Sequence, residues 1–103
     1  MRQFMIHYRR AAGDDTDWHA EIGRFIAALD ADPALAGKIG YRVVKRRDEP
    51  EYFHIATVHD EAAVKVLQSR PFFAGYTARN REVSGGTVEV IPLDFVGETR
   101  PSR

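Results

Sequence analysis

Two histidines lie in segments of alternating polarity, where a side chain is directed to one face of a sheet. His54 alternates with Tyr52 and Ala56, and His7 lies in the first alternating segment, near the start of the chain. A neutral imidazole that lines a cleft can act as a general base towards a phenol. We therefore predict His54 and His7 as candidate catalytic residues, and we expect strand pairing to bring them near each other. The alternative for both is a partly buried histidine that hydrogen-bonds a neighbour.

A metal site is not expected. Two histidines without a third ligand are a poor zinc site, and the chain has no cysteine to supply thiolates. The remaining histidines, His19 and His59, lie beside expected helix starts, where we expect them to be solvated.

Several aromatic residues could form the wall of a site for a flat ligand. Such a site needs apolar faces and a few polar groups. Four of these residues lie on segments expected to be helical and to face a sheet, where core packing is the alternative, and two tyrosines could supply hydroxyl groups. The candidate binding residues are Trp18, Phe72, Phe73 and Tyr76 from the helices and Tyr41 and Tyr52 from the strands.

Composition disfavours several classes of protein. The 103 residues carry 15 basic and 15 acidic side chains, so the net charge is zero, and a nucleic-acid partner is not expected. No apolar run approaches the length of about 20 residues that spans a bilayer, and we expect no membrane partner. The first ten residues alternate in polarity without a cleavage site, so we predict a cytoplasmic location.

The first half of the chain predicts a strand, a helix and a hairpin. Polarity alternates from residue 2 to residue 10, which is typical of a half-buried strand. Asp15 or Thr16 is expected to cap a helix that ends at Asp32-Pro33. Its apolar stripe comprises Trp18, Ile22, Phe25, Ile26 and Leu29. Two strands, at residues 39–45 and 52–58, then form a hairpin with a charged turn.

The second half repeats the strand and helix order. Asp60 is expected to cap a short helix, and Pro71 to start a further helical piece. Residues 87–95 form the last strand, with Pro92 indicating an edge position or a bulge. We expect one domain over residues 1–96 and a loosely held tail over residues 97–103.

The order βαββαβ predicts an α+β, ferredoxin-like fold: a four-stranded antiparallel sheet with helices on one face. Both faces of the sheet carry apolar residues, and one helical layer can bury only one of them. The uncovered face would be a liability in a monomer. We therefore predict a homodimer that packs sheet on sheet.

The order of elements, the junction FHIATVHDEAAV and the later SRPFF resemble the antibiotic biosynthesis monooxygenase domain of the dimeric α/β-barrel superfamily. The resemblance covers residue 2 to about residue 96. It implies a dimer with clefts between sheet and helices that bind flat aromatic molecules. It also implies oxygenation of phenolic or quinol rings without a metal or an organic cofactor. Related members degrade haem, and others have no known activity.

At three positions the residues of this chain can be compared with those common in the resembled family. His54 stands where that family often has a polar residue in the third strand, and Val58 stands at its tryptophan position. Phe72-Phe73 stands where the family often has a histidine before a phenylalanine. The haem-degrading members have an asparagine in the first strand, which this chain lacks.

Two hypotheses for the function remain open. The first is a cofactor-independent monooxygenase for a small phenol-like or quinol-like substrate, with His54 or His7 taking the phenolic proton. The second is a non-catalytic dimeric module of the same fold that binds a small ligand or supplies an interface. Val58 and Phe72 are apolar at positions where the resembled family often has a tryptophan and a histidine, which favours the second hypothesis. The activity of the resembled family favours the first.

Overall fold

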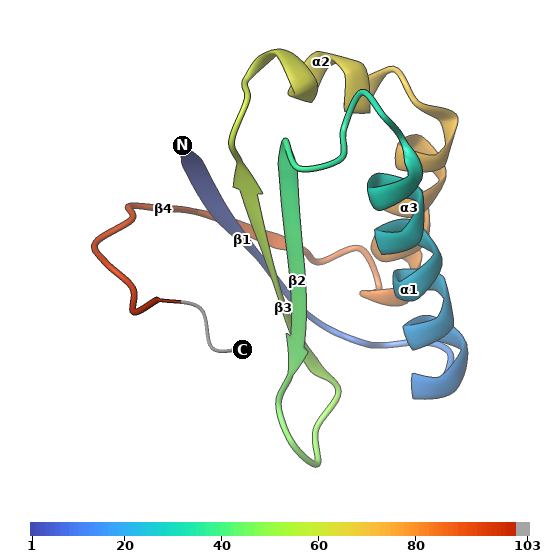
Figure 1. Ribbon diagram of the computed structural model, residues 1–103. Helices are drawn as coiled ribbons and strands as arrows, with labels where there is room; N and C mark the ends of the chain where they lie inside the picture. Colours follow the sequence, from blue (N-terminus) through green and yellow to red (C-terminus); the bar gives the residue numbers. More distant parts are fainter. Residues whose placement is uncertain (101–103) are drawn as a thin grey trace.

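The computed structural model describes residues 1–100, and the predicted order of elements is confirmed (Figure 1). Four strands form one antiparallel sheet in the order β2-β3-β1-β4. The elements are β1 (Arg2–Arg9), α1 (Asp15–Ala31), β2 (Ile39–Lys45), β3 (Glu51–Val58), α2 (Ala62–Gln68), α3 (Pro71–Val83) and β4 (Glu89–Leu93). All three helices lie on one side of the sheet (Figure 1). This is the α+β, ferredoxin-like arrangement that the sequence predicts.

The helix α1 begins one residue earlier than predicted. Asp14, and neither Asp15 nor Thr16, is the N-cap: its backbone is extended and its carboxylate accepts a hydrogen bond from the Asp17 N–H at 2.8 Å. Asp15 is instead the first helical residue, and its carboxylate is bound by Arg10 at 2.8 Å. Asp15, paired with Arg10, is thus inside the first turn of the helix and is not its cap.

The other end of α1 is where the sequence predicts it. The helix ends at Ala31, and Asp32 has the extended backbone that a residue before proline favours. The Asp32 carboxylate accepts from the Ala34 N–H and pairs with Arg70 at 2.9 Å, which joins this loop to the start of α3. Gly37 closes the loop with a φ of 76°, a conformation that glycine adopts without strain.

The strands differ from their predicted bounds mainly at β4. This strand is shorter than the predicted residues 87–95, because only its central residues pair with β1, from Gln3 to His7. It lies at the edge of the sheet, which confirms the position that Pro92 indicates. Residues 94–100 follow without a helix or strand. The predicted tail extends to residues 101–103, which lie outside the described residues.

Alternation along β3 decides which side chains enter the core. Four residues of this strand are buried against the helices, namely Tyr52, His54, Ala56 and Val58. From α1, the buried residues are Trp18, Ile22, Phe25 and Leu29, with Ile26 partly buried, so the predicted stripe is confirmed. The two layers therefore meet over a core that is rich in aromatic rings.

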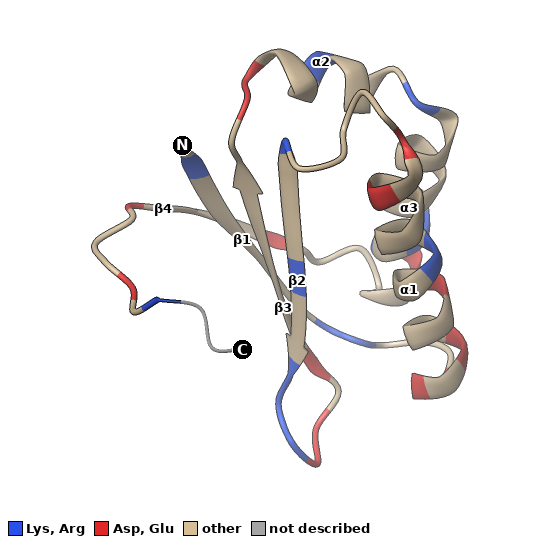
Figure 2. Cartoon of the chain, viewed as in Figure 1, with Lys and Arg blue, Asp and Glu red and all other residues tan. Residues whose placement is uncertain are grey.

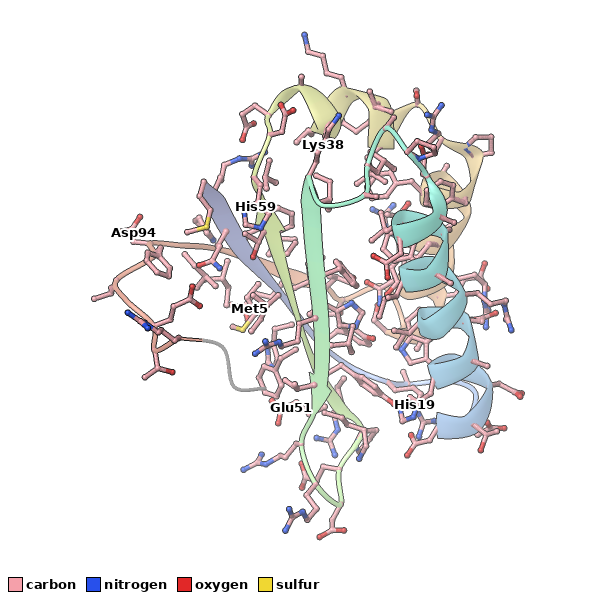
Figure 3. All side chains as sticks on the ribbon, viewed as in Figure 1. Met5, His19, Lys38, Glu51, His59 and Asp94 are labelled. Atoms are coloured by element: carbon pink, nitrogen blue, oxygen red, sulfur yellow. The ribbon has the colours of Figure 1, made fainter. Side chains whose placement is uncertain are left out.

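The opposite face of the sheet, which we call the outer face, has no helix of residues 1–100 over it. In Figure 3 the labelled Met5 lies on this side of the sheet, away from the helices. The register of the strands places Phe53, Ile55, Ile91 and Leu93 on the same face. Figure 2 shows basic residues before acidic ones at the turn between β2 and β3, and the register also places charged Arg42 and Glu89 on the outer face. No helix within residues 1–100 is long and apolar enough to cross a membrane.

The assignment of the cap leads to a stability prediction. Asp14→Ala removes the carboxylate that satisfies the Asp17 N–H, and we expect the free energy of unfolding to fall by about 1 kcal/mol. Urea denaturation followed by circular dichroism measures this. Thr16→Ala, at the exposed residue next in the helix, is the control and should change the value by less than about 0.5 kcal/mol. Equal effects of the two substitutions would contradict the cap at Asp14.

Candidate functional site

A cavity of about 220 Å³ lies between the sheet and the helices. Most of its wall is apolar, with Phe4, Ile6, Phe25, Leu29, Ala56, Val58, Leu67 and Phe73 among the lining residues. The polar residues that line it are Tyr41, Tyr76, Thr77, Asn80, Arg2 and Gln68. A cavity of about 150 Å³ suffices for benzene, whereas drug-sized ligands occupy about 300 Å³ or more. This cavity therefore suits one or two fused rings.

His54 lies beside the cavity without lining it. Its side chain is fully buried, and both ring nitrogens are hydrogen-bonded to tyrosines. Nε2 lies 2.7 Å from the Tyr8 hydroxyl, while Nδ1 contacts the Tyr41 hydroxyl and lies 3.3 Å from that of Tyr76. Burial lowers the pKa of His54 to about 4, because desolvation disfavours the imidazolium. At neutral pH the ring is therefore uncharged.

The hydrogen bonds of Tyr8 are consistent with one tautomer of His54. Trp18 can only donate, and its Nε1–H lies 2.7 Å from the Tyr8 oxygen. Tyr8 can then donate its own proton to His54 Nε2. This arrangement leaves the ring proton of His54 on Nδ1, which donates to Tyr41.

From Tyr41 the chain of hydrogen bonds continues to the cavity. The Tyr41 and Tyr76 hydroxyls are 3.2 Å apart, so Tyr41 can donate to Tyr76 and leave the Tyr76 proton for a ligand. Burial raises the pKa of Tyr76 to about 12 and that of Tyr41 still further, so both hydroxyls keep their protons at neutral pH. Tyr41 and Tyr76, which line the cavity, are therefore neutral donors that are hydrogen-bonded to each other and to His54.

Stacked rings fix the position of Tyr76. Its ring lies parallel to that of Phe25 with centroids 3.9 Å apart, and it also stacks on Trp18 at 5.7 Å. Packing of this kind restricts the side chain to one rotamer. The Tyr76 side chain, which lines the cavity, is thus held in place before any ligand arrives.

Three of the six predicted binding residues line the cavity, namely Tyr41, Phe73 and Tyr76, and Trp18, Tyr52 and Phe72 do not. Trp18 instead donates a hydrogen bond to the Tyr8 hydroxyl and stacks on the Tyr76 ring. The Tyr52 hydroxyl donates to Asp15 at 3.1 Å and contacts His19 at 2.8 Å, near the start of α1. His19, labelled in Figure 3, therefore has a protein partner rather than water alone.

The sequence did not single out Tyr8 and Asn80. Tyr8 shares the helix-facing side of the sheet with His54 through the neighbouring pairs Tyr8–Tyr52 and Ile6–His54. The register of β1 on β3 would have indicated that Tyr8 lies near His54, but the sequence does not give that register. Asn80 follows Tyr76 by one helical turn on α3, a spacing that places both on one face.

His7 belongs to the outer face and not to this cavity. It pairs with Phe53, the residue before His54, and neighbouring strand residues point to opposite faces. The expectation that pairing brings the two histidines together is therefore wrong. His7 Nε2 lies 2.7 Å from Glu51 and Nδ1 lies 3.1 Å from Glu89. Both hydrogen bonds raise the pKa of His7, and the one to Glu51 has the larger effect.

Comparison with known proteins identifies the fold. No family model matches the chain, and no curated protein does. Among solved structures, SnoaB, a cofactor-independent oxygenase from Streptomyces nogalater, superposes with a TM-score of 0.71 at 20% identity. That match covers 98% of this chain and 97% of SnoaB. An asparagine-to-alanine variant of SnoaB matches at the same TM-score with 19% identity.

Two further structures carry the name of the family that the sequence resembles. A putative antibiotic biosynthesis monooxygenase from Bacteroides thetaiotaomicron gives a TM-score of 0.75 at 15% identity, over 99% of this chain and 95% of that one. Another, from Caulobacter crescentus, gives 0.74 at 13% identity, over 93% and 90%. The resemblance is thus confirmed for the fold over nearly the whole chain.

The burial of neutral His54 predicts a pH dependence. An unfolded histidine binds its proton near pH 6.5, whereas folded His54 does so only near pH 4. As the pH falls between these values the unfolded state gains the proton first, so the stabilisation that His54 provides is lost. In urea titrations, the stability difference between wild type and His54→Gln should shrink by roughly 3 kcal/mol from pH 7 to pH 4. A difference that is independent of pH would contradict the neutral buried ring.

Proposed function

We propose that this protein binds a small phenol-like or quinol-like aromatic molecule in the cavity and oxygenates it without a metal or an organic cofactor. The observation that carries the proposal is the chain of hydrogen bonds from buried, neutral His54 through Tyr41 and Tyr76 to an otherwise largely apolar cavity. The fold shared with SnoaB, a cofactor-independent oxygenase, supports the same class of reaction.

The reaction uses electrons that the substrate itself supplies. A suitable bicyclic substrate is 1,5-dihydroxynaphthalene, which has an electron-rich carbon opposite a phenolic oxygen. One oxygen atom of O₂ becomes the carbonyl at that carbon, and the other leaves as water with two hydrogens. The products are 5-hydroxy-1,4-naphthoquinone and water, so atoms and electrons balance without another reductant.

The protein's part is to form and stabilise the phenolate. A donor that is already oriented stabilises a developing oxyanion strongly in a dry site, and Tyr76 is held in this way by Phe25 and Trp18. His54 can take up the phenolic proton through Tyr76 and Tyr41 once its Nδ1 is free of hydrogen. The apolar wall excludes water from the reacting carbon.

We also propose that the outer face is the interface of a homodimer. Its apolar side chains include Met5, Phe53, Ile55 and Ile91, together with Val44, which is 47% exposed. Among the described residues, no helix covers this side of the sheet (Figure 1). Apolar side chains on a sheet face that no helix of the described residues covers are typical of an interface between subunits. On this proposal His7 and its two carboxylate partners lie within the contact rather than at the cavity.

The oxygenase proposal predicts oxygen consumption with 1,5-dihydroxynaphthalene and formation of the quinone. His54→Gln and Tyr76→Phe each remove one group of the hydrogen-bond chain, and we expect either to lower kcat about 100-fold. An oxygen electrode and the quinone absorbance measure both rates. The matched control is His59→Gln at an exposed histidine outside the cavity, which should keep the wild-type rate. Full activity in His54→Gln and Tyr76→Phe would reject the mechanism, and binding without oxygen uptake would favour the non-catalytic module.

The dimer proposal predicts a change of mass on substitution of the outer face. Ile55→Arg places a charge among the apolar residues, and we expect a folded monomer by light scattering coupled to gel filtration. Ala78→Arg on the exposed side of α3 is the control and should remain dimeric. A wild-type protein that is monomeric at micromolar concentration would contradict the interface.

A further inference from the structure

Asn80 has a buried amide donor without a partner. The residue is 7% exposed, and its Nδ2 atom is buried and makes no hydrogen bond within the part of the chain that the structure describes. Leaving a buried donor unpaired costs about 1–3 kcal/mol. Native proteins contain few such groups, and each calls for an explanation.

Its position suggests what the donor is for. Asn80 lines the cavity together with Tyr41 and Tyr76, and it lies one helical turn beyond Tyr76. Its amide donor also lies near the Tyr8 hydroxyl without meeting the geometry of a hydrogen bond, and from there it lowers the pKa of Tyr8 against the larger, opposing effect of burial. Asn80 therefore lies beside both the cavity and the Tyr8 end of the hydrogen-bond chain.

We propose that the Asn80 amide holds an acceptor oxygen of the cavity ligand and thereby positions the proton of His54. The inference rests on the proposed function and narrows its ligand class. The ligand would be an aromatic molecule of one or two rings that carries a carbonyl or phenolate oxygen. The donor without a partner in the free protein would find its partner on that oxygen.

One rotation of the Asn80 carboxamide would connect its contact with the ligand to the position of the His54 proton. Turning the carboxamide about its terminal torsion, which is soft, exchanges Oδ1 and Nδ2. Nδ2 then reaches the ligand, and Oδ1 accepts the proton of the Tyr8 hydroxyl. Tyr8 no longer donates to His54 Nε2, so that nitrogen carries the ring proton and Nδ1 is free to accept from Tyr41. Ligand binding thus converts His54 from a donor into the acceptor that proton transfer requires.

A matched pair of ligands tests the contact with the acceptor oxygen. Tetralin and 1-tetralone share one bicyclic skeleton and differ at a single carbon by the carbonyl oxygen. By calorimetry we expect wild type to prefer 1-tetralone. Asn80→Leu, which is similar in volume and lacks the donor, should reduce that preference about 3- to 10-fold. Arg81→Leu, at an exposed residue of the same helix that does not line the cavity, is the control and should keep the preference; Asn80→Ala is the second variant if Asn80→Leu does not fold.

The second readout is the tautomer of His54, which a purely structural role for Asn80 would not change. Nitrogen NMR of ¹⁵N-histidine protein, with His54→Gln for assignment, should place the proton on Nδ1 in the free protein. Addition of 1-tetralone should move it to Nε2 in wild type and not in Asn80→Leu.

The outcomes separate this inference from the proposed function. An unchanged ligand preference in Asn80→Leu, or a tautomer that ignores 1-tetralone, overturns the role of Asn80 even if 1,5-dihydroxynaphthalene is oxidised. A lost preference and a shifted tautomer without any oxygen uptake support Asn80 and overturn the oxygenase. Failure of wild type to bind either bicyclic compound or 1,5-dihydroxynaphthalene overturns both.

Discussion

A fully buried imidazole that is uncharged and hydrogen-bonded at both nitrogens is the constraint on which the rest of this structure depends. His54 can be buried at low cost only if both nitrogens have partners. Those partners come from different elements: Tyr8 from β1, Tyr41 from β2 and Tyr76 from α3, with Trp18 of α1 behind Tyr8. The network therefore also fixes how the helices lie against the sheet.

The same constraint gives the cavity its chemical character. Because His54 and its tyrosines are neutral, the cavity offers directed hydroxyl groups and no buried charge next to them. Val58, at the position where the resembled family has a tryptophan, lines this space with a small side chain. The wall thus combines many apolar residues with a few polar ones. This combination suits the orientation of a flat phenol.

The sequence predicted those features that follow from periodicity. Alternation placed His54 on one face of its strand, and the helical stripe placed Trp18 and Phe25 against the sheet; both are confirmed. The shortened β4 could not be predicted, because its length is set by pairing with β1 and not by its own residues. Asp14, Asp15 and Thr16 are all residue types that can cap a helix, so propensity alone could not select Asp14.

The members of the candidate site were harder to predict than the fold. Which aromatic residues reach the cavity depends on the rotation of α1 and α3, so Phe73 lines it and Phe72 does not. Tyr8 and Asn80 acquire their importance from neighbours that are distant in the sequence. His7 was misplaced relative to His54 because the register of β1 on β3 sets their faces, and only the structure gives that register.

The most direct test of the central claim is a crystal structure of the protein soaked with 1,5-dihydroxynaphthalene without oxygen. We expect the ring between the sheet and the helices, with one oxygen within hydrogen-bonding distance of the Tyr76 hydroxyl. Electron density for the ligand elsewhere, or a ligand in the cavity with both oxygens turned away from Tyr76 and Tyr41, would contradict the role assigned to the His54 network.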